Sequence, residues 1–378
     1  LLYKLSKYRG TENSIRSSIG VICLHKFGYN NFKKLSLIFD RLIPQVDIEY
    51  IKFTSWCVGR LVHHPDPYES HYATQLFRRV MDWTRMKGRR ARPLAAVYML
   101  ESLSYNAGSI AVSLLPSFQN TLWSIVSIPS IFIIKQTAKA IKSYTGAIIR
   151  YSRNNLNEHL TFIIHVCLKL LFFDDQIRQY ASLLIFQVLF DSSPHSFVPY
   201  FNELINDICK VTKGNTSLIL NCGTYLAMSS LSQVNPSTFV ESFAEYHFQQ
   251  TESLIYDFPI EITQSLIQMC SSIPEFIEKK LDQIKQFGTK LIDEEPDCSF
   301  RLLSTLLECF GAKVLPIGDE TLIRFIQIPF SEDFNHFFTT LMSCNSTISA
   351  DVQICLFKRI IKKLRSENKV IALNLISH

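Results

Sequence analysis

Glycine is scarce in this chain, which has only 12 among its 378 residues. That scarcity argues against a turn-rich β protein and against nucleotide-binding folds built on glycine-rich loops. Charged residues are also few, at 19%, while hydrophobic residues make up 47%. So much apolar side chain can bury a large core, which excludes general disorder. The formal net charge of +6 permits an acidic partner without demanding one.

Long hydrophobic runs and a secretory signal are missing as well. The two most apolar stretches are residues 122–134 and 160–173, and both are shorter than the roughly 20 residues that span a bilayer. Polar residues interrupt both, so we expect buried helices and no transmembrane segment. Because residue 1 is Leu and not Met, the chain is expected to be a piece of a longer protein.

The ten cysteines do not have the spacing of a metal site, since no two are separated by only two residues. Most lie in apolar helical runs, which predicts buried, reduced thiols in a cytosolic protein. One other group has the ligand types of a zinc site. Its members are His63, His64, Asp66 and His71. Two prolines mark this segment as a loop between helices and its spacing matches no known site, so no metal is expected.

Motifs for catalysis are absent too. Phosphoryl transfer needs a glycine-rich phosphate loop, a His-Arg-Asp catalytic loop and an Asp-Phe-Gly motif, and the chain has none of them. His165 and Cys167 are close in sequence, but residues two apart on a helix point to different sides. The sequence therefore predicts no catalytic residue, no cofactor and no small-molecule substrate.

What the chain does contain is a repeated helical pattern. Apolar residues recur every three or four positions, as in Leu35, Ile38 and Leu42. Helical segments pair into a unit, and the second helix of each pair is expected to begin at regular intervals. These starts are Asn13, Asp47, Arg89, Pro129, Asp174, Asn215, Pro259 and Pro296. Their spacing is about 34–46 residues, which matches the roughly 40–47 of HEAT and armadillo repeats.

The first helix of each pair is expected between these starts. The ranges are 32–43, 69–86, 109–127, 156–173, 198–211, 238–247, 276–292 and 321–328. Pro116 lies inside one of them and should kink or split that helix. The candidate linkers are residues 250–258 and 292–297. Helical pattern continues, with less regular spacing, through 334–343 and 351–365.

Several second helices share the way they open. Asp47 precedes Ile51-Lys52 and Asp174 precedes Ile177-Arg178. The acid can cap the helix, and the basic residue can bridge to an acid of a neighbouring repeat. This recurrence predicts an all-α superhelix, a HEAT- or armadillo-type solenoid of about eight or nine helix pairs. We expect HEAT repeats over 1–328 and continuing, less regular helical repeats over 329–378.

A basic cluster spans the end of one predicted helix and the start of the next. It consists of Arg78, Arg79, Arg85, Lys87, Arg89, Arg90 and Arg92, with Asp82 among them. Three interpretations stay open: a solvated turn with salt bridges between repeats, a docking patch for an acidic protein, and a nucleic-acid site. Nucleic acid is the least favoured, because it usually needs a longer basic stripe with exposed aromatics. The candidate protein-binding residues are Arg85, Lys87, Arg89, Arg90 and Arg92.

Three stretches resemble the N-terminal HEAT region of the target-of-rapamycin (TOR) kinases, which are phosphatidylinositol-3-kinase-related kinases. The first, Ser55-Trp56-Cys57-Val58-Gly59-Arg60-Leu61, is similar to that family's Ala-Ile-Gly-Arg-Leu-Ala helix. The second runs from Phe77 to Leu103 and contains Trp83, Gly88-Arg89-Arg90 and an apolar helix over 94–101. The third is Leu115-Pro116-Ser117-Phe118 with the downstream Ile134-Lys135 helix. From Asp174 to about Ile292 the resemblance continues as helix order and length.

That resemblance implies an arm of a TOR-like serine/threonine protein kinase acting in nutrient and growth signalling. Its partners would be a second TOR copy and a Raptor-like regulatory subunit. The protein would be located in the cytoplasm or held on endomembranes through these partners. The kinase domain would lie downstream of this chain, which itself is not an enzyme. The alternatives are a HEAT-repeat adaptor of transport or phosphatase type with no kinase attached, and a nucleic-acid-binding helical solenoid.

Overall fold

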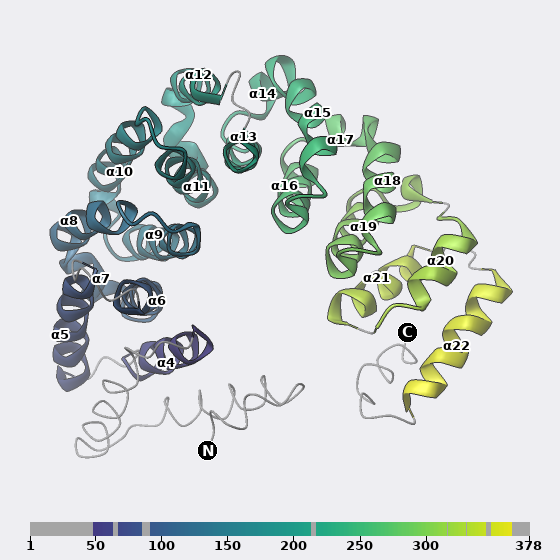
Figure 1. The fold of residues 1–378 in the computed structure, drawn as a ribbon, viewed down its shortest axis with the longest axis horizontal. Helices are drawn as coiled ribbons and strands as arrows, with labels where there is room; N and C mark the ends of the chain where they lie inside the picture. Colours follow the sequence, from purple (N-terminus) through teal and green to yellow (C-terminus); the bar gives the residue numbers. More distant parts are fainter. Residues whose placement is uncertain are drawn as a thin grey trace. The chain divides into compact units, whose positions relative to one another are not determined.

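The computed structural model describes residues 48–62, 67–84, 91–212, 217–315, 317–329, 331–344 and 349–364. Within these ranges the chain is all-α, with short 3₁₀ helices and no strand. The helices follow one another as antiparallel pairs (Figure 1). Two compact units divide the chain at Ser196 and Phe197, and each is described by itself.

The first unit has two layers of helices, here called the B layer and the A layer. Its B layer contains α4 (Ile48–Leu61), α6 (Ala91–Asn106), α9 (Ile131–Tyr151) and α11 (Gln176–Ser192). Its A layer contains α5 (Pro67–Trp83), α7 (Gly108–Ser113), α8 (Leu115–Val126) and α10 (Leu156–Leu171), the last preceded by η1 (Arg153–Asn155). Successive B-layer helices of this unit pack on one another. In addition, α5 packs on α6, α7 and α8 pack on α9, and α10 packs on α11.

The second unit repeats this arrangement. Its B layer contains α13 (Leu218–Leu231), α16 (Pro259–Ser272), α19 (Pro296–Phe310) and α21 (Glu332–Ser343). Its A layer contains α12 (Phe201–Thr212), α14 (Pro236–Ser242), α15 (Ala244–Leu254), α17 (Pro274–Lys279), α18 (Leu281–Leu291) and α20 (Asp319–Ile326). The remaining elements are η2 (Pro194–Tyr200), η3 (Gly311–Val314) and α22 (Ala350–Leu364), which packs on α20.

The predicted starts of the second helices agree with the structure. Every start from Asp47 to Pro296 lies within three residues of an observed B-layer helix, while Asn13 and the range 32–43 lie outside the described residues. The cap expected at Asp174 is made by its neighbour Asp175, whose carboxylate accepts hydrogen bonds from the backbone N–H of Ile177 (2.9 Å) and Arg178 (3.1 Å). The all-α prediction is confirmed for the described residues. The division expected at residue 328 stays a prediction.

Three A-layer helices are broken in two, and only one break was predicted. Pro116 splits its segment into α7 and α8, as expected, and lies in the first turn of α8. The predicted helices 238–247 and 276–292 break at Phe243 and Lys280, where no proline occurs. At the second break the Lys280 ammonium lies 2.7 Å from the Glu245 carboxylate, a contact between repeats that local pattern cannot reveal. The linker predicted at 250–258 is shorter in the structure, since α15 continues to Leu254 and only residues 255–258 connect it to α16.

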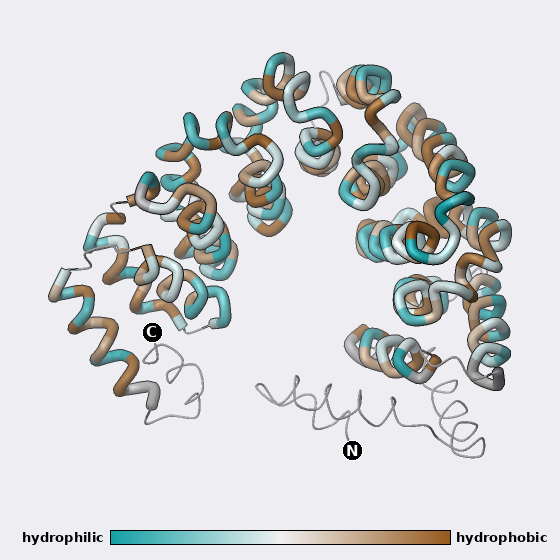
Figure 2. Tube along the Cα trace, turned by 180° about the vertical axis from the view of Figure 1, so that it is seen from behind, coloured by the Kyte–Doolittle hydropathy of each residue, from teal (hydrophilic) through white to brown (hydrophobic). Residues whose placement is uncertain are grey.

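Amphipathic helices bury their apolar sides between the layers. Figure 2 shows apolar and polar stretches alternating along the helices of each unit. In the first unit the rings of Phe118 and Tyr144 stack with centroids 3.7 Å apart. In the second unit Phe300 contacts Phe325, Phe334 and Phe337 with ring centroids 5.3–5.6 Å apart. Each fully buried Phe side chain contributes about 1.5–3 kcal/mol from burial alone.

Gly59 marks a close approach between α4 and α6. A Cβ atom there would lie 2.6 Å from Asn106 Nδ2 and even nearer to Ser102 Oγ, which donates a hydrogen bond to the Ser55 carbonyl (2.7 Å). We expect Gly59→Ala to lower the free energy of unfolding by about 1–3 kcal/mol, as overpacking does. Gly146, in the middle of α9, is the matched control, because a Cβ there meets nothing within 4 Å.

For Gly146→Ala the expected change is a gain of about 0.5–1 kcal/mol, since Ala favours a helix interior over Gly. Urea denaturation of both variants measures the two effects. An equal response of the two glycines would contradict the close approach at Gly59.

Candidate protein-binding surfaces

The basic cluster predicted from the sequence is described only in part. Arg85, Lys87, Arg89 and Arg90 lie outside the described residues. Arg92 is half-buried in the first turn of α6. On α5, the Arg79 guanidinium lies 5.8 Å from the centroid of the Trp83 ring. Protein binding at this turn therefore stays a prediction.

No group of three or more His, Cys, Asp or Glu residues that could hold a metal ion occurs in the part of the chain that the structure describes. His63, His64 and Asp66 of the zinc-like group lie outside that part. His71 is exposed on α5, where Gln75 Nε2 donates a hydrogen bond to its Nε2 (2.8 Å). In the same ranges no helix combines the length and apolar character needed to cross a membrane.

The side chains of His165 and Cys167 do not form a reactive pair. On α10, His165 is exposed while Cys167 is fully buried, so the two side chains face different sides as predicted. Burial raises the pKa of the Cys270 thiol to about 12, and burial is the main cause that raises the pKa of Cys298 to about 11. Thiols with such pKa values are protonated at neutral pH and react poorly.

Two buried histidines each lie against a buried tyrosine. In the first unit His159 lies against Tyr144 with ring centroids 5.7 Å apart, and in the second unit His247 stacks on Tyr225 at 4.0 Å. Hydroxyl groups of Thr145 (3.1 Å) and Ser229 (2.9 Å) hydrogen-bond to their respective Nε2 atoms. Desolvation lowers the pKa of His159 to about 4 and that of His247 to about 3. Both rings are therefore neutral at pH 7, and both are buried in the core of their unit.

Helix α9 carries basic side chains along one face. It contains Lys135, Lys139, Lys142 and Arg150 and no acidic residue. Their spacing of four, three and eight residues places them along one side of the helix. Lys139, Lys142 and Arg150 are exposed, and Lys142 lies 3.9 Å from Asp191 of α11.

A cavity of about 320 Å³ lies beside this face, between α4 and α6, and reaches Ser143 of α9. Trp56, Arg60, Glu101 and Tyr105 are among the residues that line it. Gln136 of α9 donates a hydrogen bond to the Glu101 carboxylate, and partial burial raises the pKa of Glu101 above its usual value. Ser55 also lines the cavity, and its hydroxyl has no hydrogen-bond partner among the described residues.

Two arginine–aromatic pairs lie at this cavity. The Arg60 guanidinium lies 5.7 Å from the Trp56 ring, and the Arg150 guanidinium lies 5.7 Å from the Tyr105 ring. Tyr105 is 61% exposed. We name the cavity and its surroundings the α4–α6–α9 face, made of Trp56, Arg60, Glu101, Tyr105, Ser143, Lys139 and Arg150. The sequence analysis did not predict this face, although the absence of acidic residues from 131–151 indicated a basic helix surface.

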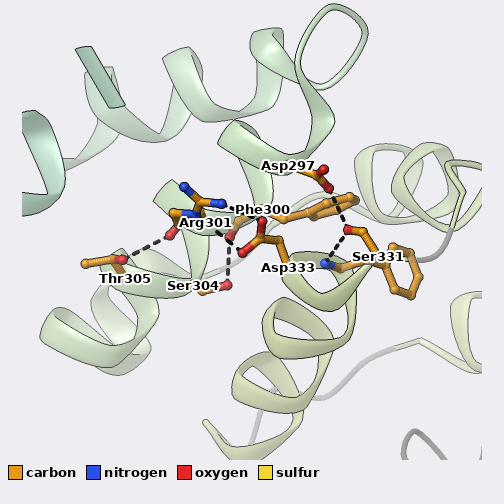
Figure 3. Close-up of polar contacts among 8 residues, drawn as sticks. Asp297, Phe300, Arg301, Ser304, Thr305, Ser331 and Asp333 are labelled. Carbon is orange, nitrogen blue, oxygen red and sulfur yellow. Dashed lines mark hydrogen bonds and ion pairs between the residues drawn. The ribbon is translucent and has the colours of Figure 1, made fainter. Parts of the chain in front are cut away.

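Polar contacts between successive repeats were expected, and the second unit contains a series of them. Figure 3 shows Arg301 of α19 bound to Asp333 of α21 (2.8 Å), while Ser331 donates a hydrogen bond to Asp297 (2.6 Å). Further pairs separated by 31–35 residues join other repeats. They are Lys280 with Glu245, Lys313 with Glu278, and Arg324 with Asp293.

These pairs differ from the one expected at the opening of α11. The guanidinium of Arg178, expected to bridge to an acid, lies instead over the Phe173 ring at 4.2 Å. Exposed ion pairs contribute roughly 0–1 kcal/mol each, so the series adds little to the stability of the repeats.

Comparison with known proteins identifies the fold of the chain but does not assign the chain to a family. No family model matches the chain, and no curated protein sequence does. Among solved structures it is similar to yeast importin-β (Kap95p), with 13% identity over 99% of this chain and 50% of that one and a TM-score of 0.57. It is also similar to the karyopherin Kap121p bound to the SUMO protease Ulp1p, with 12% identity over 97% of this chain and 45% of that one and a TM-score of 0.51.

The chain thus spans about half the length of these karyopherins. At such low identity the similarity shows the fold alone. That fold is the all-α, HEAT-type superhelix predicted from the repeat pattern. The comparisons do not point to the TOR kinases in particular.

Proposed function

We propose that this chain is a non-catalytic HEAT-repeat scaffold that binds other proteins, as an adaptor of the transport type with no kinase attached. The observation that carries this proposal is the stack of helix pairs, which bury their apolar sides against their neighbours. Such repeats leave long ridges of side chains open for partners. The fold similarity to two karyopherins, one of them solved with a protein bound, favours the transport type.

The first part of this proposal to test is whether an acidic protein binds at the basic cluster around Arg89 and Arg90. We expect affinity purification of the full chain to recover specific proteins, and Arg89→Glu/Arg90→Glu to reduce recovery of at least one of them about tenfold, the effect of roughly 1.4 kcal/mol. The measurement is quantitative mass spectrometry of the recovered proteins. Two exposed lysines of A-layer helices provide the control variant, Lys169→Glu/Lys290→Glu, which makes the same change in charge elsewhere.

The outcomes separate the turn from the scaffold. Equal recovery of every protein by the Arg89→Glu/Arg90→Glu variant would show that the basic cluster is not a docking site. It would not contradict the scaffold function. If no protein is recovered above background by the unaltered chain, the scaffold function itself fails.

A TOR-like arm is the second candidate, and the three resembling stretches favour it. In the first unit Ser55–Leu61 lie on α4, residues 77–83 and 91–103 on α5 and α6, and 115–118 and 134–135 on α8 and α9. On this proposal the whole protein is a serine/threonine kinase in the cytoplasm or on endomembranes, with a second copy and a Raptor-like subunit as partners. The complete coding sequence decides the matter: a kinase domain in the same reading frame supports the arm, and a full reading frame without one contradicts it.

A further inference from the structure

The α4–α6–α9 face combines positive charge with a cavity of side-chain size. Arg60, Lys139 and Arg150 come from two B-layer helices and lie around or beside the cavity mouth. Glu101, beside Lys139, is the only acid among the described residues that line the cavity, and Gln136 already hydrogen-bonds to its carboxylate. A surface with this charge balance attracts acidic segments and repels basic ones.

The cavity and its rim suit the anchor residue of a peptide. Its volume of about 320 Å³ is near the lower end of the roughly 300–1,000 Å³ typical of ligand pockets. Trp56 and Tyr105 at its edge, each with an arginine beside the ring, are residue types that dominate binding energy at protein interfaces. The Glu101 carboxylate supplies a hydrogen-bond acceptor for the N–H groups of a bound main chain.

Single-stranded nucleic acid fits this face less well. Bases stack on open aromatic faces, but arginine guanidinium groups already lie over the Trp56 and Tyr105 rings.

We propose that the α4–α6–α9 face binds an extended acidic segment of a partner protein. An aromatic or aliphatic side chain of that segment enters the cavity, and its Asp and Glu carboxylates pair with Arg60, Lys139 and Arg150. This inference rests on the proposed scaffold function and names the chemistry of one of its partners.

The test is a selection from a displayed library of random 12-residue peptides on the immobilised full chain. We expect the recovered peptides to be enriched in Asp and Glu around one aromatic or aliphatic residue. Fluorescence anisotropy with the most enriched synthetic peptide then measures binding to the full chain and to its variants. Replacing the anchor residue of this peptide by Ala should weaken binding about tenfold or more, as expected for an interface hot spot.

Two variants of the chain test the two parts of the face separately. Lys139→Glu/Arg150→Glu should weaken binding of the peptide about tenfold or more, and Ser143→Phe should do the same by filling the cavity. The control Lys169→Glu/Lys290→Glu should bind the peptide like the unaltered chain. Circular dichroism confirms that each variant is folded.

Several results would overturn the proposal. They are recovery of no peptide, recovery without acidic enrichment, or equal binding of the peptide by the Lys139→Glu/Arg150→Glu variant. Binding of a 20-residue oligodeoxythymidine that is lost in that variant, without binding of acidic peptides, would assign the face to nucleic acid. If proteins are still recovered by affinity purification in any of these cases, only the α4–α6–α9 proposal fails and the scaffold function stands.

Discussion

Replacing Phe300 by Ala is expected to lower the free energy of unfolding of the second unit by about 3–5 kcal/mol. Phe300 is fully buried, and its ring contacts the rings of Phe325, Phe334 and Phe337, which belong to α20 and α21. Removing it leaves a cavity where three helices meet, and each neighbouring ring loses packing partners. Urea denaturation followed by circular dichroism measures the change.

Two comparisons make the Phe300 prediction specific. Phe357 on α22 is 60% exposed, so Phe357→Ala should change stability by no more than about 0.5 kcal/mol. Phe300→Leu keeps most of the volume and should cost less than Phe300→Ala, within about 1.5 kcal/mol. A cost below about 1 kcal/mol for Phe300→Ala would show that this aromatic cluster does not hold the repeats together.

Acidification is expected to destabilise both units through the buried histidines. Each folded unit keeps its imidazole neutral down to a pKa of about 4 for His159 and about 3 for His247, while an unfolded chain protonates histidine near 6.5. Below pH 6.5 the unfolded state therefore binds more protons, and stability falls as the pH falls. The contribution is absent above pH 6.5 and reaches about 2 kcal/mol for each histidine at pH 5.

The difference in unfolding free energy between pH 7.5 and pH 5 measures this effect. His159→Gln should reduce that difference by about 2 kcal/mol, and a second substitution, His247→Gln, should reduce it by a similar amount. His165 lies on the same helix as His159 and is exposed, so His165→Gln is the matched control and should leave the difference unchanged. An unaltered pH dependence in His159→Gln would mean that this ring is protonated in the folded state.

These predictions concern the core. The two proposed functions differ in whether the whole protein contains a kinase domain. The adaptor proposal is supported by fold similarity to karyopherins, and the TOR proposal by short sequence stretches on α4 to α9. Both require the surface to bind proteins. The peptide selection therefore informs either one, while the complete coding sequence separates them.

The sequence by itself determined the fold class and the positions of the helices. Apolar periodicity and caps are local, so a start such as Pro259 or Pro296 could be located to the residue and the Pro116 break anticipated. Recurrence at about 40 residues then implied stacking, because a single helical hairpin cannot bury its own apolar side.

Only the tertiary structure decided which residues meet across that repeat distance. The approach of Gly59 to Ser102, the break at Lys280 and the burial of His247 all depend on contacts between neighbouring helices. The α4–α6–α9 face likewise arises from side chains of three helices that are separated by some 40 residues each. The local sequence pattern does not predict how these three helices align with one another. The physical reason is that periodicity reports which side of a helix is buried, whereas a binding surface depends on how neighbouring helices align.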